Sequence, residues 1–110
     1  MTIRPTNIFD PLPPAGEEEI FEVLARGRDA IVERIVSHGQ STPADAWLEQ
    51  ERTEWVVLLQ GRARIRFRDD DSEIELNPGD AVTIPAGVRH RVTMTSPHAP
   101  TVWLAVHFAD

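Results

Sequence analysis

Glu54 and His90 have the residue types and the local settings expected of a chemical site. His90 follows a strand-like run that tight turns bound on both sides, at residues 77–80 and 85–87. Glu54 alternates with Val56 along an apolar segment, so a core-facing Val56 would place this carboxylate in the interior, where it needs a cation, a metal or a hydrogen-bond donor. Imidazole and carboxylate are good ligands for divalent iron, manganese, nickel or zinc.

Glycine and proline precede His90 at fixed offsets. Gly79, Pro85, Gly87 and His90 together match the pattern G-x5-P-x-G-x2-H, which is the second sequence motif of the cupin family. The family often has asparagine four residues after this histidine, and this chain has Met94 there.

The first cupin motif, G-x5-H-x-H-x3,4-E-x6-G, is matched only in its second half. Glu54 and Gly61 fit E-x6-G. With both motifs in order and a short segment between them, the chain resembles a small single-domain cupin over about residues 31–108.

The resemblance implies a divalent metal held by two histidines and a glutamate of the first motif and one histidine of the second. Glu54 and His90 occupy two of these positions. The H-x-H pair is missing: a three-residue gap puts Leu48 and Gln50 at its positions, and a four-residue gap puts Trp47 and Glu49 there.

The candidate metal ligands are therefore Glu54 and His90, with Gln50 or Glu49 and, on a later strand, His107. A glutamine oxygen is a weak, uncharged donor, so any site would be loose. His107 shares a strand face with Trp103 and Ala105, but the alternation alone leaves open which face looks inward.

The rest of the chain predicts an all-β domain. Proline-rich residues 1–19 read as an extended N-terminal arm, and residues 20–110 as one cupin-type double-stranded β-helix, a jelly-roll barrel. Between residues 17 and 37 the spacing of four apolar residues would also suit a helix face: Ile20, Leu24, Ile31 and Ile35. Gly27 and the branched residues over 30–36 favour two strands joined near Gly27 instead. We expect further strands at residues 47–52, 54–60, 62–68, 73–76, 81–84, 89–95 and 101–108.

Residues 62–68 alternate arginine with apolar residues, and residues 73–76 alternate glutamate with apolar residues. A hairpin between them would align arginines and glutamates across the strands on a wet outer face. The same alternation puts Met94 on the face of His90 and Val92, which predicts an apolar inner wall.

The composition limits the kinds of partner and metal site that we expect for this protein. The 110 residues carry a net charge of −7, which argues against nucleic-acid binding, and the absence of cysteine excludes thiolate metal sites. No apolar run is long enough to span a bilayer, so a cytoplasmic protein without a membrane partner is expected. The N-terminal arm could pack on its own domain or on a second copy in a homodimer.

Two functions are open from the sequence. The first is a cupin that binds a divalent metal weakly in the barrel cavity and acts on a small carboxylate or enolisable molecule. The second is a non-catalytic barrel that binds a small molecule or another protein and whose metal site is degenerate. Nucleophile elbows, phosphate-binding glycine loops and H-E-x-x-H helices are absent from the sequence.

Overall fold

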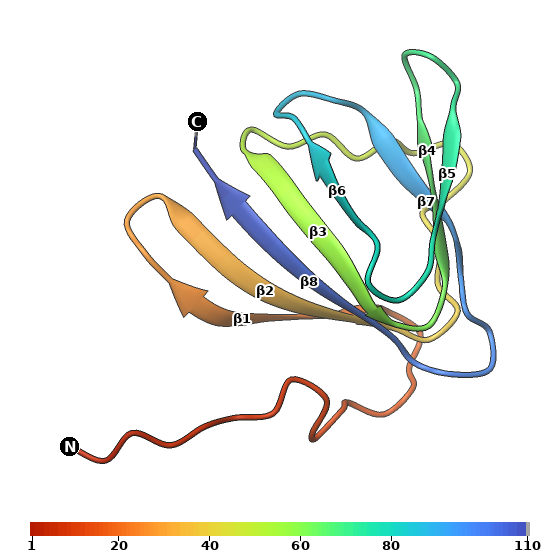
Figure 1. Ribbon diagram of the computed structural model, residues 1–110. Helices are drawn as coiled ribbons and strands as arrows, with labels where there is room; N and C mark the ends of the chain where they lie inside the picture. The colour runs from red at the N-terminus through yellow and green to blue at the C-terminus, as the bar shows by residue number, and fades with distance from the viewer. Residues whose placement is uncertain (110) are drawn as a thin grey trace.

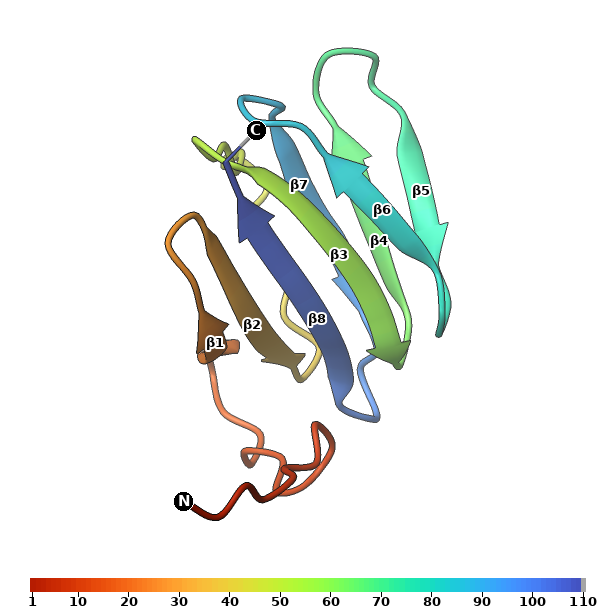
Figure 2. The same cartoon turned by 60° about the vertical axis from the view of Figure 1, so that its left-hand side comes forward.

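The computed structural model describes residues 1–109, which form eight β-strands and no helix (Figures 1 and 2). The strands are β1 Ile20–Arg26, β2 Ala30–Ser37, β3 Thr53–Gln60, β4 Ala63–Phe67, β5 Glu73–Leu76, β6 Ala81–Ile84, β7 His90–Thr95 and β8 Thr101–Phe108. Within this range no helix is long and apolar enough to cross a bilayer.

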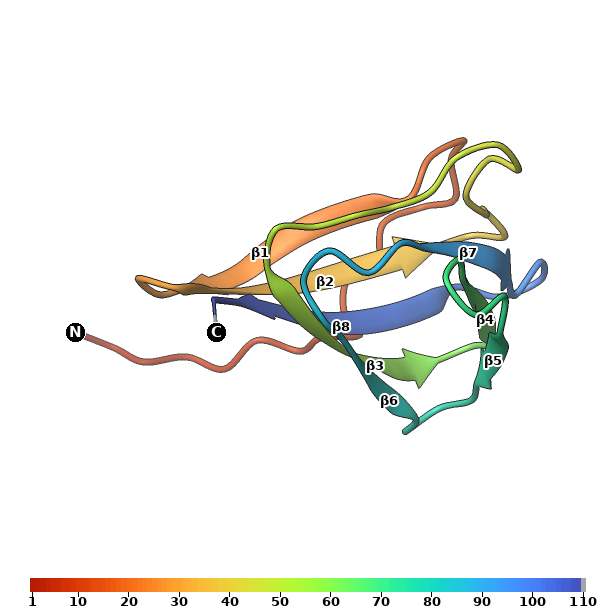
Figure 3. The same ribbon diagram turned by 90° about the horizontal axis from the view of Figure 1, so that it is seen from above.

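The strands form two antiparallel sheets that enclose the core. One sheet has the order β1-β2-β8-β3-β6, and the other has the order β5-β4-β7. Seen from above, the five-stranded sheet curves toward the smaller sheet, and the connection from β2 to β3 runs across the open side (Figure 3). The prediction of an all-β fold of the double-stranded β-helix type is confirmed.

Side-chain alternation sets the two faces of the larger sheet. The inner face carries the core residues Ile35 of β2, Val56 and Leu58 of β3, and Trp103 and Ala105 of β8, all buried. Trp55, on the opposite face of β3, is exposed. Because side chains alternate along a strand, this inner face also receives Glu33, Glu54 and His107.

The two strands expected around Gly27 are present as the antiparallel pair β1 and β2. The strand expected over residues 47–52 is wrong, because this segment crosses the open side of the barrel and has no continuous partner there. It is held by an isolated bridge between Leu48 and His90, with N–O distances of 2.7 and 3.0 Å. The Gly87 N–H adds a bond of 2.8 Å to the Gln50 carbonyl.

The arginine–glutamate hairpin has the expected register, with Arg64 opposite Glu75 and Arg66 opposite Glu73. Its ion pair differs from the expected cross-strand pairs. Arg66 Nε lies 3.0 Å from Asp71 Oδ1 in the turn, and Glu73 accepts a hydrogen bond of 3.0 Å from the Thr93 hydroxyl. Asp71 in the turn therefore pairs with Arg66 in place of the cross-strand glutamate.

Met94 does not line the interior, contrary to the expected inner wall. A β-bulge shifts the register between β4 and β7, so that Met94 lies opposite Arg64 while Val92 lies opposite Ile65. The extra residue reverses the alternation, so that the buried Thr95 follows the partly buried Val92 on the inner face. An irregularity of this kind leaves no mark in the period-2 pattern.

The N-terminal arm contacts its own domain through Arg34 of β2. This buried guanidinium donates to the carbonyls of Ile8 (3.0 Å) and Pro11 (3.1 Å) and pairs with the carboxylate of Glu22. Arg34 alternates with Glu33 and therefore lies on the outer face of the sheet. This part of the arm, residues 8–11, thus packs on the face opposite the barrel interior.

Gly61 connects β3 to β4 in a conformation that only glycine adopts easily. Its φ is +89°, and a Cβ here would lie 2.9 Å from the Thr101 Cα and 2.5 Å from its hydroxyl. This close approach to Thr101 explains why the first motif ends in glycine.

Gly61→Ala should lower the free energy of unfolding by roughly 2–4 kcal/mol, because it adds both backbone strain and a steric clash with Thr101. Urea denaturation monitored by tryptophan fluorescence measures the change. The matched control is Gly16→Ala, where a new Cβ meets no atom within 4 Å. Equal stability of the two variants would contradict this explanation.

Candidate functional site

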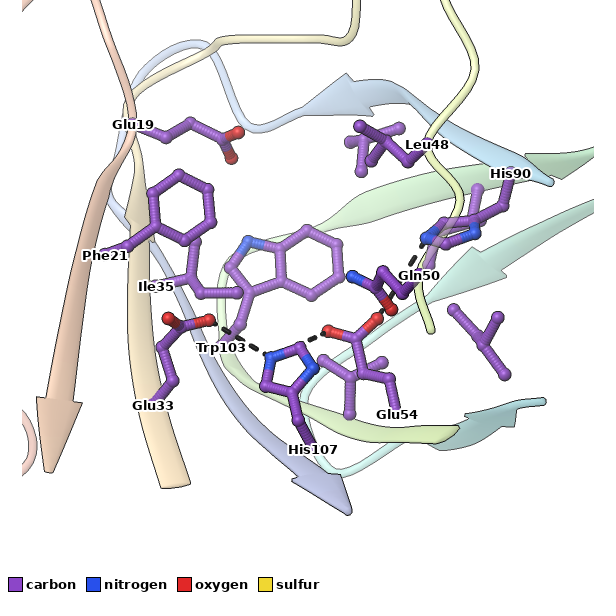
Figure 4. Close-up of a pocket in the computed structure, with 14 residues that line it drawn as sticks. Glu19, Phe21, Glu33, Ile35, Leu48, Gln50, Glu54, His90, Trp103 and His107 are labelled. Carbon is purple, nitrogen blue, oxygen red and sulfur yellow. Dashed lines mark hydrogen bonds and ion pairs between the residues drawn. The ribbon is translucent and has the colours of Figure 1, made fainter. Parts of the chain in front are cut away.

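A cavity of about 100 Å³ opens between the inner face of the larger sheet and the β2–β3 connection (Figure 4). Phe21, Ile35, Leu48 and Trp103 contribute to its apolar wall. Its polar lining consists of Glu19, Glu33, Gln50, Glu54, His90 and His107. Of the five residues predicted from the sequence, all but Glu49 line this cavity.

Glu54 is the central ionisable group of the cavity. Only 6% of the residue is exposed. Burial raises the pKa of its carboxyl group above the ordinary value, and the carboxylate of Glu33 raises it further. His107, His90 and a hydrogen bond from the Gln50 side chain lower this pKa, but burial is the largest effect. Glu54 therefore accepts a proton more readily than an exposed glutamate.

His107 points into the cavity, which settles the question that alternation left open. It is the direct cross-strand neighbour of Glu54. Its Nε2 lies 3.2 Å from Glu33 Oε1 and 3.7 Å from Glu54 Oε2 (Figure 4). One imidazole nitrogen thus lies between two carboxylates from the strands on either side of β8.

His90 approaches Glu54 from the opposite side of the cavity. Its Nδ1 lies 2.9 Å from the Val88 carbonyl, so Nδ1 carries a proton that it donates to this acceptor. In the neutral ring Nε2 is then an acceptor, and it lies 4.0 Å from Glu54 Oε1. The turn before β7 thereby fixes both the orientation and the tautomer of His90.

The bridge between Leu48 and His90 decides between the two possible gaps in the first motif. Leu48 and Gln50 line the cavity, as the three-residue gap requires. Glu49 is exposed, and its carboxylate pairs with Arg89 at 2.8 Å on the outside. Glu49 is therefore away from the other candidate ligands.

Glu33 is a cavity residue that the sequence reasoning missed. Its signal was present, because a single glutamate shares one strand face with Ile31 and Ile35. A charged residue in an apolar stripe suggests a polar partner inside the fold. The partner, His107, is 74 positions away along the chain, and only the pairing of β2 with β8 brings the two together.

The family model described as "Cupin domain" matches residues 32–107 of the chain. This chain belongs to the cupin family. No curated protein matches it significantly.

Solved structures agree with this assignment. A crystal structure from Ralstonia eutropha JMP134, named "putative mannose-6-phosphate isomerase", is 37% identical with a TM-score of 0.93, and the match covers 98% of this chain and 100% of that one. A protein from Thermus thermophilus is 20% identical (TM-score 0.77; 97% and 98% covered). A cupin superfamily protein from Desulfitobacterium hafniense DCB-2 is 21% identical (TM-score 0.72; 90% and 84% covered).

The cupin family implies a metal, but the side chains at the metal-ligand positions of this cupin do not fit one well. These positions carry Leu48, Gln50, Glu54 and His90, so one has no donor and one has only a neutral amide. Among residues 1–109, no group of three or more histidine, aspartate or glutamate side chains has the arrangement that would hold a metal ion. Two strong ligands do not make a stable divalent site.

Restoring the histidine pair should restore metal binding. The double variant Leu48→His, Gln50→His would direct two imidazoles toward Glu54 and His90, so we expect Ni²⁺ or Zn²⁺ to bind at least about tenfold more tightly than to the wild type. Calorimetric titration of EDTA-treated protein measures this difference. The control, Trp47→His with Glu49→His, changes residues outside the cavity and should gain nothing.

Burial of Glu54 also predicts a pH dependence. The pKa of Glu54 is higher in the folded state than in the unfolded state, where it is about 4.5. The stabilisation that comes from protonating Glu54 is therefore complete below about pH 4.5 and is lost as the pH rises through the folded-state pKa. Glu54→Gln resembles the protonated form at every pH. Its free energy of unfolding relative to the wild type should therefore increase as the pH is raised from about 4 to about 8. Urea titrations across this range measure the difference, and a constant difference would contradict the burial argument.

Proposed function

We propose that this cupin binds a small enolisable molecule in its barrel cavity and transfers protons on it, with Glu54 as general acid and base. The observation that carries the proposal is the position of Glu54, buried in the cavity between two imidazoles. A catalytic base works best when its pKa lies near the operating pH, and burial moves the pKa of Glu54 in that direction.

In the proposed reaction the Glu54 carboxylate accepts a proton from a carbon next to the ligand's carbonyl group. The electron pair of that C–H bond moves into the enolate, and the same carboxyl group returns the proton to the original carbon. Where that carbon also bears a hydroxyl group, the intermediate is an enediolate: the hydroxyl proton passes to the former carbonyl oxygen, and Glu54 delivers its proton to the former carbonyl carbon. The apolar wall limits the access of water, which would compete for the proton.

His107 and Glu33 give Glu54 a route to solvent. The Nε2 of His107 lies within 3.7 Å of both carboxylates, so it can exchange a proton with either one. Glu33 is the more accessible of the two acids, with 19% of its side chain exposed against 8% for Glu54. In this proposal His107 and Glu33 are positioning and relay residues.

The name of the Ralstonia eutropha neighbour supports the reaction class. Aldose–ketose isomerisation moves a proton between adjacent carbons, which is the step proposed for Glu54. The similarity supports the type of chemistry and does not extend to the sugar phosphate in that name. The second candidate function, a binding protein without catalysis, is favoured by the incomplete metal-ligand set.

Proton transfer can be tested by deuterium exchange. We expect the EDTA-treated protein to accelerate the incorporation of deuterium from D₂O next to the carbonyl of hydroxyacetone or aminoacetone, and proton NMR follows this incorporation. Glu54→Gln should slow this exchange by about 100-fold or more. A rate that is the same in wild type and Glu54→Gln would reject catalysis.

Filling the cavity with a larger side chain tests whether binding and exchange occur there and not elsewhere on the surface. Leu48→Trp should fill the cavity from its edge and abolish both binding and exchange. The control is Leu24→Trp, which makes the same substitution at an exposed leucine outside the cavity lining. Binding that is lost in Leu48→Trp, without exchange in any variant, would identify the non-catalytic alternative.

A further inference from the structure

We propose that the cavity selects small molecules that carry a protonated amine, and that it disfavours carboxylates and phosphates. The inference rests on the proposed ligand-binding function of the same cavity and adds the chemical class of its ligand. It departs from the small carboxylate that the family resemblance suggested.

The charges around the cavity favour a cation. Glu19, Glu33 and Glu54 contribute three carboxyl groups to the lining. Although the chain has 11 basic side chains, all of them arginine, none lines the cavity within residues 1–109. Sites that recognise carboxylates or phosphates normally supply a guanidinium or ammonium group. A phosphorylated sugar would meet three carboxyl groups and no guanidinium group in the described part of the lining.

One buried acceptor inside the cavity lacks a donor, and His90 offers a second acceptor beside it. Gln50 Oε1 is a buried oxygen without a hydrogen-bond partner in the described part of the chain. His90 Nε2 is an acceptor in the neutral ring, because Nδ1 donates to Val88, and it faces Glu54 Oε1 across 4.0 Å. Buried acceptors that find no donor cost free energy. An ammonium group has three N–H donors and could satisfy this set.

The aromatic side of the cavity is held in place beside a carboxylate. The Trp103 indole N–H donates to the Ser37 hydroxyl at 3.1 Å, and this hydroxyl donates to Glu19. Figure 4 shows the indole lying between Glu19 and Phe21 on one side and Gln50 and Glu54 on the other. Aromatic faces attract organic cations and do not attract anions.

The size of the cavity restricts the ligand further. About 100 Å³ is well below the volume of sites that take drug-sized molecules. A short aliphatic amine places its ammonium group near Gln50 and Glu54 and its carbon chain against Leu48 and Ile35. This arrangement uses both the polar and the apolar parts of the lining.

Three probes of equal chain length test the inference: propylamine, 1-propanol and propionate, titrated at pH 7.5 into EDTA-treated protein. Binding is followed by the NMR shift of the Trp103 indole N–H, assigned with a Trp103→Phe variant. We expect propylammonium to bind at least about tenfold more tightly than propionate, with propanol between them. Propionate or propanol binding as tightly as propylammonium would overturn the inference.

Variants that replace a glutamate by glutamine show which carboxylates are responsible for the preference for the amine. Glu33→Gln and Glu19→Gln should each weaken propylammonium binding by about fivefold or more while leaving propanol binding nearly unchanged. Glu49→Gln removes an exposed carboxylate outside the cavity and should leave both affinities unchanged. Equal effects of all three variants would show a general surface attraction and overturn the site assignment.

The two proposals fail in different ways. If propionate binds best while hydroxyacetone still exchanges deuterium in a Glu54-dependent manner, the amine class is wrong and proton transfer stands. If propylammonium binds with the expected selectivity and no probe exchanges deuterium, the amine class stands and catalysis is wrong. If no probe binds and none exchanges, both proposals fall.

Discussion

The short backbone bridge between Leu48 and His90 is the contact on which the site depends. It joins the β2–β3 connection to the first residue of β7, and the Gly87 N–H fixes the Gln50 carbonyl beside it. Earlier in the same connection, Thr42 also bonds to β7, with its N–H 2.8 Å from the Val92 carbonyl oxygen, but the bonds at Leu48 and Gln50 are those that lie beside the cavity. With them, Leu48, Gln50 and His90 face the cavity together, and Glu49 is directed outside. A few main-chain hydrogen bonds therefore define which side chains form the site.

The replacement of the histidine pair changes the character of the cupin cavity. Leu48 and Gln50 make the edge of the cavity at the β2–β3 connection uncharged. Three ionisable groups come from the adjacent strands β2, β8 and β3, which carry Glu33, His107 and Glu54. The polar centre is thus carried by the rigid five-stranded sheet. Strands hold side chains more precisely than loops do, which suits a site that must transfer protons over short distances.

The sequence predicted the fold well because turns and alternation are local signals. Gly79, Pro85 and Gly87 located a strand and its flanking turns, and the alternation around Glu54 identified its buried face. The errors arose where distant contacts decide. Residues 47–52 have the sequence of a strand, but in the fold they pair with β7 only at one isolated bridge. The bulge beside Met94 does not alter the period-2 pattern of the sequence. Glu33 meets His107 only because β2 pairs with β8.

Arg34 and Glu33 are consecutive residues of one strand, and they serve opposite faces of the sheet. Arg34 holds the N-terminal arm on the outside, while Glu33 contacts His107 inside. The arm and the cavity therefore share the backbone of β2. The N-terminus is consequently an unsuitable place for fusion partners or truncation when the cavity is studied.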